Sequence, residues 1–204
     1  MPDPHAPAIP LLVSTRNAHK IAEIRAILGA AFAVCDLSAI PEMPDVEESG
    51  ETFEENATLK AMAASVRFSG WVIADDSGLE VDALGGDPGV RSARYAGEPA
   101  SDPANNALLL KNLETASSRT ARFRCVIVLV RTGQKQAVFT GAVEGTIISS
   151  PRGAAGFGYD PLFVPDGHEE TFAELGAEVK NGLSHRARAL AGLRAWAEGN
   201  GVVG

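Results

Sequence analysis

The first half of the chain alternates between short apolar runs and segments with helical spacing. Residues 9–14 are apolar and predict a strand, and isoleucine and leucine then recur at helical spacing over residues 21–28 until Gly29 ends the run. The same criteria predict a strand over residues 32–37, an acidic, proline-containing loop over 41–50, a helix from about 52 to 68 and a strand over 71–74. The chain is therefore expected to open with a β-loop-α unit.

The second half departs from a purely parallel series of strands and helices. Pro103 opens a helix, the stretches 121–130 and 136–148 predict a long hairpin, and a final helix begins near Ser184. Because a hairpin adds antiparallel strands, we expect an α/β fold with a mixed central sheet flanked by helices. We also expect this fold to form two lobes with an active-site cleft between them. No repeat or linker divides the chain, so residues 1–204 are expected to form a single domain.

Composition and charge narrow the class of partner. The 204 residues are 45% hydrophobic and 22% charged, which is typical of a globular chain with a substantial core. The formal net charge of −8 argues against nucleic acid or a membrane surface as a partner, although it permits a local basic pocket for a phosphorylated ligand. Cys35 and Cys125 are too few for a disulfide framework and are spaced unlike zinc ligands, so buried thiols in a reducing compartment are expected.

The chain shows no pattern of secretion or membrane insertion. Its proline-rich start, residues 1–10, lacks a positive region followed by an apolar stretch, so we expect a loose lead-in rather than a secretory signal. The most apolar later run, residues 125–130, is far shorter than the roughly 20 residues that a membrane-spanning helix needs. The protein is therefore expected to be cytoplasmic.

Two adjacent carboxylates follow the apolar run of residues 71–74. The segment Asp75-Asp76-Ser77-Gly78 places acidic groups where the strand is expected to end, and open α/β sheets bind ligands at the carboxyl ends of their strands. Neighbouring aspartates repel each other, and a hard cation such as Mg²⁺, shared with a polyphosphate, would relieve that repulsion. Because aspartate, serine and glycine are also ordinary turn formers, a solvated turn is the alternative.

The loop after the first expected strand carries groups that suit a phosphate. Residues 14–20, Ser-Thr-Arg-Asn-Ala-His-Lys, supply two hydroxyls, an amide and the Lys20 ammonium just before a helix, whose first N–H groups attract anions. The loop has neither the GxxxxGK[ST] nor the GxGxxG pattern, so neither a P-loop nor a dinucleotide fold is indicated. An ordinary helix cap at Thr15 or Asn17 is the alternative.

Two later clusters combine aromatic, acidic and basic residues. Residues 156–161 join glycines and aromatic residues to Asp160, and an aromatic ring beside glycine can offer its face to a nucleobase. Residues 180–186, Lys-Asn-Gly-Leu-Ser-His-Arg, hold two cations and a histidine around Ser184, a suitable cap for the last helix. A tight turn packed on the core and a solvated basic turn are the respective alternatives.

Six motifs follow one another in a recognisable order. They are Thr15-Arg16-Asn17-Ala18-His19-Lys20 with Glu23, Glu54-Glu55-Asn56-Ala57 with Lys60, Ala74-Asp75-Asp76-Ser77-Gly78-Leu79, Gly85-Gly86-Asp87-Pro88-Gly89 with Ser92-Ala93-Arg94-Tyr95, Phe157-Gly158-Tyr159-Asp160, and Ser184-His185-Arg186. In these motifs the chain resembles the inosine triphosphate pyrophosphatase family. The match runs from residue 15 to residue 186, which is nearly the whole chain.

This resemblance implies Mg²⁺-dependent hydrolysis of aberrant purine nucleoside triphosphates (dITP, ITP, XTP) to the monophosphate and pyrophosphate, which cleanses the nucleotide pool, and it suggests a homodimer. Asp76 would be the principal Mg²⁺ ligand and the candidate proton acceptor for the attacking water, with Glu47 a second ligand and Asp75 a supporting one. The substrate-binding residues that the resemblance implies are Thr15, Arg16, Asn17, Ala18, His19, Lys20, Lys60, Ser77, Arg94, Phe157, Gly158, Tyr159, Asp160, Lys180, His185 and Arg186.

By the same resemblance, Phe157 would stack on the base, and the base edge would be surrounded by Tyr159, Asp160, His185 and Arg186. Hypoxanthine and xanthine carry a 6-oxo acceptor, whereas the 6-amino group of adenine would leave these donors unsatisfied, which is costly in a buried site. No feature in the pattern excludes guanine.

A related pyrophosphatase for modified pyrimidines or ordinary nucleotides is one alternative. A non-catalytic nucleotide-binding module is another, although three carboxylates beside the phosphates argue against it.

Overall fold

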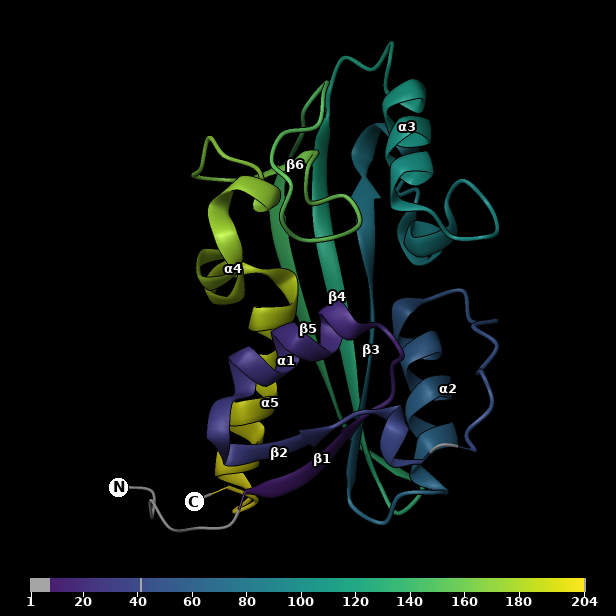
Figure 1. Ribbon diagram of the computed structural model, residues 1–204, viewed down its shortest axis with the longest axis vertical. Helices are drawn as coiled ribbons and strands as arrows, with labels where there is room; N and C mark the ends of the chain where they lie inside the picture. Colours follow the sequence, from purple (N-terminus) through teal and green to yellow (C-terminus); the bar gives the residue numbers. More distant parts are fainter. Residues whose placement is uncertain (1–7, 41, 204) are drawn as a thin grey trace. The chain divides into compact units, whose positions relative to one another are not determined.

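A computed structural model describes residues 8–40 and 42–203 of the chain (Figure 1). Residues 1–7 of the expected lead-in and Pro41 of the expected acidic loop lie outside the described residues. The strands and α-helices are β1 (Ile9–Val13), α1 (Ala18–Leu28), β2 (Phe32–Cys35), α2 (Phe53–Ser65), β3 (Trp71–Val81), α3 (Asp102–Asn112), β4 (Thr120–Arg131), β5 (Gln134–Ile147), β6 (Phe163–Pro165), α4 (Phe172–Leu183) and α5 (His185–Gly199).

The strands form a six-stranded sheet in the order β2-β1-β3-β4-β5-β6. β1 pairs in parallel with β2 and with β3, whereas β5 pairs antiparallel with β6, so the expected mixed sheet is confirmed. Thr132 and Gly133 join β4 to β5, and their positive φ angles of 49° and 73° suit the tight turn of the expected hairpin. Cys125 on β4 is buried as expected, but Cys35 is partly exposed because β2 is an edge strand.

The chain divides into two compact units. The first comprises Met1–Asp76, Val126–Thr140 and Arg186–Gly204, and the second comprises Ser77–Cys125 and Gly141–His185. β3, β4 and β5 contribute residues to both units. The expected cleft between two lobes and the assignment of the whole chain to a single domain stay predictions.

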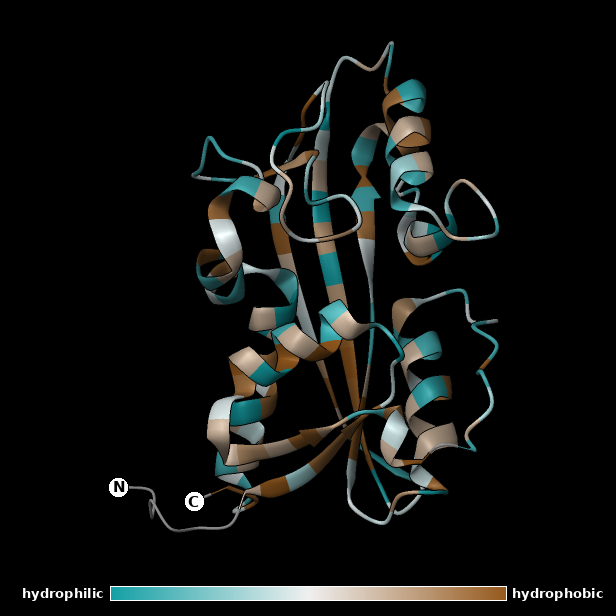
Figure 2. Cartoon of the chain, in the orientation of Figure 1, coloured by the Kyte–Doolittle hydropathy of each residue, from teal (hydrophilic) through white to brown (hydrophobic). Residues whose placement is uncertain are grey.

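In the first unit, β1 is buried on both faces, because residues 11–13 are at most 1% exposed. Such a continuous apolar run is typical of a parallel strand covered on both sides. Figure 2 shows most of β1 in the brown of apolar residues, whereas α2 carries alternating apolar and polar bands. α1 begins after Asn17, whose side-chain oxygen accepts hydrogen bonds from the N–H groups of His19 and Lys20 at 2.9 and 3.2 Å. The expected β-loop-α opening is confirmed.

The core of the second unit contains three phenylalanine rings. Phe123 of β4 lies with its ring centroid 4.8 Å from that of Phe163 of β6 and 5.9 Å from that of Phe172 of α4. The Phe163 and Phe172 centroids are 5.2 Å apart. These rings bury large apolar areas and pack strands and a helix together.

One strand is longer than expected. The strand predicted to end at Ala74 continues as β3 to Val81, so the prediction that Asp75 and Asp76 follow its carboxyl end is wrong. Leu79 and Val81 are fully buried, and this second apolar stretch carries the strand past the acidic pair. The alternative of a solvated turn is excluded as well, because both aspartates are buried within the strand.

Gly78 serves close packing rather than a turn. A Cβ atom at this position would overlap the Gly89 carbonyl and the Ser92 hydroxyl. Ser92 Oγ accepts the N–H of Leu79 at 2.9 Å and donates to the Gly89 carbonyl at 2.6 Å, so the missing side chain lets this loop hydrogen-bond to β3.

The remaining boundaries differ in smaller ways. α2 ends at Ser65 rather than near residue 68, and α5 begins at His185, close to the expected Ser184. α4 and β6 were not predicted. Gly176 within α4 has a φ of 77°, which glycine adopts readily, and this kink obscures the helical spacing. In the described part of the chain, no helix has the length and apolar character needed to cross a bilayer.

Candidate active site

Asp75 and Asp76 occupy successive positions of β3, where neighbouring side chains point to opposite faces of the sheet. Both side chains are buried. Because of this alternation, the two carboxylates have different nearest partners instead of sharing one. Both groups of partners belong to the first compact unit.

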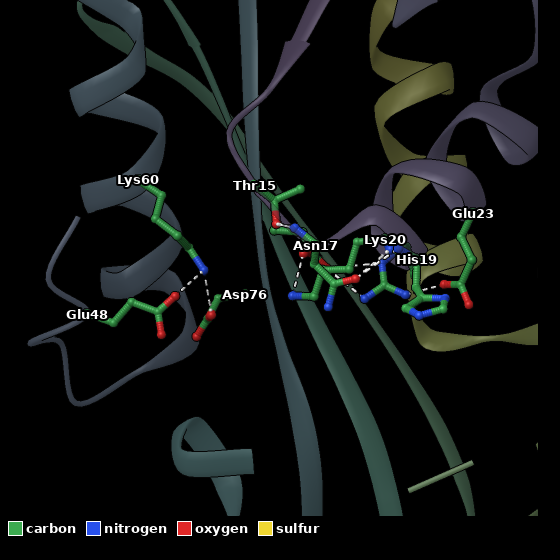
Figure 3. A network of polar contacts seen from close by, with 10 residues as sticks. Thr15, Asn17, His19, Lys20, Glu23, Glu48, Lys60 and Asp76 are labelled. Carbon is green, nitrogen blue, oxygen red and sulfur yellow. Dashed lines mark hydrogen bonds and ion pairs between the residues drawn. The ribbon is translucent and has the colours of Figure 1, made fainter. Parts of the chain in front are cut away.

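Lys60 links Asp76 to a second carboxylate (Figure 3). Its Nζ atom lies 2.7 Å from Asp76 Oδ1 and 2.9 Å from Glu48 Oε1. Lys60 projects from α2, whose start is fixed by a capping box between Thr52 and Glu55. Burial alone would lower the pKa of Lys60, but the two carboxylates outweigh burial and raise that pKa, so the ammonium stays charged.

The second carboxylate oxygen of Asp76 has a different environment. Asp76 Oδ2 is buried and has no hydrogen-bond partner among the described residues. Burial raises the pKa of Asp76, and Lys60 opposes this only in part. Asp76 and Glu48 both pair with the Lys60 ammonium, and a cation beside Asp76 Oδ2 would further compensate the Asp76 carboxylate.

Asp75 belongs to a chain of alternating charges. Lys20 Nζ lies 2.6 Å from Asp75 Oδ1, and Nε and Nη2 of Arg186 lie 3.1 and 3.0 Å from Asp75 Oδ2. Nη1 of Arg186 in turn donates to Glu23. Burial alone would raise the pKa of Asp75, but Arg186 and Lys20 outweigh it and hold that pKa well below its ordinary value.

The loop before α1 presents its groups around the start of the helix. Thr15 Oγ1 accepts the N–H of Asn17 at 3.2 Å, and Asn17 caps α1, so the cap alternative is realised at Asn17. Ala18 and His19 are exposed in the first turn, and Lys20 is partly buried. Figure 3 shows the side chains of Asn17, His19 and Lys20 on the opposite side of β3 from Lys60 and Asp76.

The carboxylates of this site suit a hard cation that takes most of its ligands from water and substrate rather than from the protein. Among the described residues, no group of three or more His, Cys, Asp or Glu side chains is placed to hold a metal. Structural zinc and calcium sites need such a group, whereas Mg²⁺ is commonly bound by one or two carboxylates together with water and substrate phosphates. Asp76 Oδ2, to which no described group donates a hydrogen bond, is compatible with this second type of site.

The second unit contains a buried ion pair beside an aromatic ring. Lys180 Nζ lies 2.6 Å from Asp160 Oδ2, and both side chains are nearly inaccessible to solvent. The same ammonium lies 4.7 Å from the centroid of the Phe157 ring, a cation–π distance. Asp160 Oδ2 also accepts the backbone N–H of Phe157 at 2.9 Å. Asp160 and Lys180 together therefore fix the position of Phe157.

The neighbouring residues are held by hydrogen bonds within the same unit. The buried Tyr159 hydroxyl donates to the carbonyl of Ser92 at 2.9 Å, and burial raises the pKa of Tyr159. The Gly158 N–H donates to Asp102 at 2.7 Å. The His185 ring is buried and packs against Phe123.

Comparison with known proteins identifies the family. A model of the Ham1 family matches residues 11–196. The chain belongs to the Ham1 family. Among its Ham1 relatives, a protein of Geobacter sulfurreducens named dITP/XTP pyrophosphatase is 54% identical over 187 residues, covering 90% of this chain and 94% of the relative. A protein of the same name from Halalkalibacterium halodurans is 50% identical over 188 residues, covering 91% of this chain and 97% of the relative.

Solved structures of Ham1 proteins share the fold. The Staphylococcus aureus Ham1 protein superposes with a TM-score of 0.84 at 44% identity, covering 94% of this chain and 99% of that chain. A structure from Mycobacterium abscessus titled nucleoside-triphosphatase / dITP/XTP pyrophosphatase gives a TM-score of 0.74 at 43% identity, covering 91% and 98%. The family resemblance drawn from the six sequence motifs is therefore confirmed.

The structure groups the expected site residues unevenly. Lys20, Lys60, Asp75, Asp76 and Arg186 lie in the ion-pair network of the first unit. Phe157, Gly158, Tyr159, Asp160, Lys180 and His185 lie in the second unit, as do the partly buried Ser77 and Arg94. Arg16 is exposed and donates to Asp45 at 2.8 Å and to the carbonyl of Met43 at 2.7 Å. The assigned roles of these residues stay predictions.

Sequence reasoning missed Glu48. The carboxylate that reaches Lys60 belongs to Glu48, whereas Glu47 is exposed. Both residues lie in a segment without helix or strand. The spacing of apolar residues there therefore does not indicate which of the two glutamates points towards Lys60. The connection from Arg186 to Asp75 and Glu23 was also not expected, because Arg186 was assigned to the base edge.

Proposed function

We propose that this chain hydrolyses the bond between the α- and β-phosphates of aberrant purine nucleoside triphosphates, with dITP, ITP and XTP as substrates. The products would be the monophosphate and pyrophosphate. Its Ham1 relatives that are named dITP/XTP pyrophosphatase support this proposal, because they match at about half of all positions over nearly the whole chain. The observation that carries it is the buried Oδ2 atom of Asp76, close to the Lys60 ammonium, for which the described residues supply no hydrogen-bond partner.

The proposed mechanism depends chiefly on charges that are already in place. Hydrolysis spreads negative charge over the α-phosphate and the leaving pyrophosphate, and positioned cations stabilise that charge. We assign this task to Lys20 and Lys60, since each ammonium is held by an aspartate of β3. Asp76, whose Oδ1 atom is held by Lys60, is the candidate proton acceptor for the attacking water.

Mg²⁺ is the proposed cofactor, with Asp76 and Glu47 as its protein ligands and Asp75 in support. When bound, the ion would supply positive charge to the phosphates and acidify water in the site. Lys60 holds Glu48, so the exposed Glu47 in the same segment is the acidic group that is free to turn towards the ion.

We assign base selection to the aromatic ion-pair cluster of the second unit and to the residues near it. Phe157 would stack on the purine, and Asp160 and His185 would meet polar atoms at its edge. The ion pair between Asp160 and Lys180 keeps the donors and acceptors of this cluster fixed, which favours discrimination between a 6-oxo and a 6-amino group. Arg186 contributes by holding Asp75.

The first test is pyrophosphate release with Mg²⁺ from a panel of ITP, dITP, XTP, GTP, ATP and dTTP. We expect kcat/KM for the first three to exceed that for ATP by about 100-fold or more, because an adenine amino group leaves buried donors unpaired. Equal turnover of the whole panel would retain the reaction and reject the base assignment. Binding without turnover would indicate a nucleotide-binding module instead.

A pair of conservative substitutions tests the acidic ligand. Glu47→Gln is expected to raise the Mg²⁺ concentration for half-maximal activity by at least about tenfold, because losing even a residue that only orients a metal ligand costs about 10- to 100-fold in metal affinity. Glu48→Gln is expected to change it less, because Glu48 is already paired with Lys60. The measurement is activity against Mg²⁺ concentration at saturating ITP. The opposite order of effects would assign the ligand to Glu48.

We further propose a cytoplasmic homodimer that binds a purine nucleoside triphosphate and neither nucleic acid nor membrane. The net charge of −8 supports the last two points, because anionic polymers and surfaces repel such a chain. Light scattering on the purified protein tests the dimer, since the chain has a mass of 21.3 kDa and a dimer would have about twice this mass.

A further inference from the structure

The imidazole of His185 lies flat against the ring of Phe123. The two ring centroids are 4.9 Å apart and the ring planes differ by only 13°. Both side chains are buried, and both belong to the second unit. Phe123 lies on β4, an interior strand with β3 and β5 as neighbours, so the sheet fixes its backbone. The orientation of the imidazole is therefore tied to a rigid element.

The same phenylalanine is connected to the ion pair of this unit. Phe172 stacks on Phe123 with its ring plane tilted by 28°. Lys180 Nζ lies 5.7 Å from the centroid of Phe172 and 4.7 Å from that of Phe157. Phe123 thus connects His185, through Phe172, to the aromatic cluster around Lys180.

A histidine side chain needs such a support if it is to select a hydrogen-bond partner. Rotation about its χ2 angle is broad and roughly two-fold, so the backbone alone does not fix the ring plane. The ring nitrogens donate and accept within that plane, and a hydrogen bond weakens steeply when its angle departs from linearity. A parallel ring on one face restricts this rotation, because turning the imidazole would lose the stacked contact.

We propose that Phe123 is a positioning residue for base selection: it fixes the plane of the His185 imidazole so that the ring meets the 6-oxo edge of a purine and does not adapt to a 6-amino group. This inference rests on the proposed function and deepens it. Phe123 acts through His185 and does not itself touch the substrate.

The test compares two leucine substitutions in the same cluster. Phe123→Leu removes the parallel ring, whereas Phe163→Leu removes a ring that is also buried but meets Phe123 edge-on, at an interplanar angle of 65°. We expect the ratio of kcat/KM for ITP to kcat/KM for ATP to fall about tenfold in Phe123→Leu and to stay near the wild-type ratio in Phe163→Leu. Phe123→Tyr keeps a flat ring and is expected to retain the wild-type ratio.

A spectroscopic readout separates positioning from general loosening of the core. The Phe123 ring current is expected to shift the His185 ring-proton resonances, and this shift should vanish in Phe123→Leu and persist in Phe163→Leu. If Phe123→Leu does not fold, Phe123→Met takes its place, because methionine fills irregular core space.

Equal losses of discrimination in the two leucine variants, or an unchanged ratio once the ring-current shift is gone, would overturn the positioning role alone. A wild-type protein that hydrolyses none of the triphosphates would overturn the proposed function, and the positioning role with it.

Discussion

Asp76→Asn is expected to abolish pyrophosphate release, lowering kcat on the order of 1,000-fold, as when a positioned charge-stabilising group is removed from an active site. Asparagine has nearly the shape of aspartate and can still accept the Lys60 hydrogen bond at one oxygen. It lacks the negative charge that a cation beside Oδ2 requires, and its amide nitrogen cannot accept a proton from water. The measurement is steady-state pyrophosphate release from ITP at saturating Mg²⁺.

The same substitution is expected not to lower thermal stability. Burial raises the pKa of Asp76 in the folded protein above its ordinary value of 3.8, so the ionised carboxylate is less favourable in the folded than in the unfolded chain. This cost is present at neutral pH and disappears as the pH falls below 3.8. Asparagine removes the cost, and the melting temperature at pH 7 should therefore be equal to or above that of the wild type.

The control for this experiment is Asp166→Asn, at an exposed aspartate of the second unit. It is expected to leave both turnover and melting temperature unchanged. Retained turnover in Asp76→Asn would refute the assignment of Asp76 to metal binding and proton transfer. A large drop in melting temperature in the same variant would show that the Asp76 charge supports the fold instead.

Arg186→Ala is expected to lower the free energy of unfolding by about 3–5 kcal/mol, the range found when one partner of a buried ion pair is removed. The guanidinium is 1% exposed and contacts Asp75, which is fully inaccessible, and Glu23. Without it, Lys20 is the nearest cation left to Asp75. Chemical denaturation at pH 7 measures the effect.

The stability lost in Arg186→Ala should become smaller as the pH falls. In the folded wild type the pKa of Asp75 lies well below its ordinary value of 3.8, so this ion pair stabilises the fold above pH 3.8 and the stabilisation fades as the pH falls towards the depressed pKa. In Arg186→Ala that pKa should rise, because its largest favourable partner is gone. The difference in stability between wild type and variant is therefore expected to shrink below about pH 4.

Arg25→Ala is the matched control. Arg25 also pairs with an aspartate, Asp36, but at 3.3 Å and with half of the arginine side chain exposed. Exposed pairs contribute about 1 kcal/mol or less, so this variant should be nearly as stable as the wild type. If Arg186→Ala were equally mild and lost only its preference for ITP over ATP, Arg186 would be a base-recognition residue, as the family resemblance first suggested, rather than a support for Asp75.

Local pattern predicted the opening of the fold well. Residues 9–13 form a strand and residues 18–28 form a helix, because the spacing of their apolar residues, the Asn17 cap and the terminating Gly29 all favour those elements. The pattern failed at β3, where the change from apolar to acidic residues resembled the end of a strand. β3 continues because its far half is also buried, and local charge carries no information about that burial.

The sequence by itself determined the α/β class, the mixed sheet, the Ham1 family and the two aspartates at the centre of the proposed site. Only the tertiary structure decided which charged groups pair with one another. Arg186 forms an ion pair with Asp75 although 111 positions of sequence separate them, and Lys60 pairs with Glu48 rather than with the neighbouring Glu47. The physical reason is that periodicity reports which face of an element is buried, whereas a buried charge is paired by whatever the packing of distant elements brings within hydrogen-bond distance.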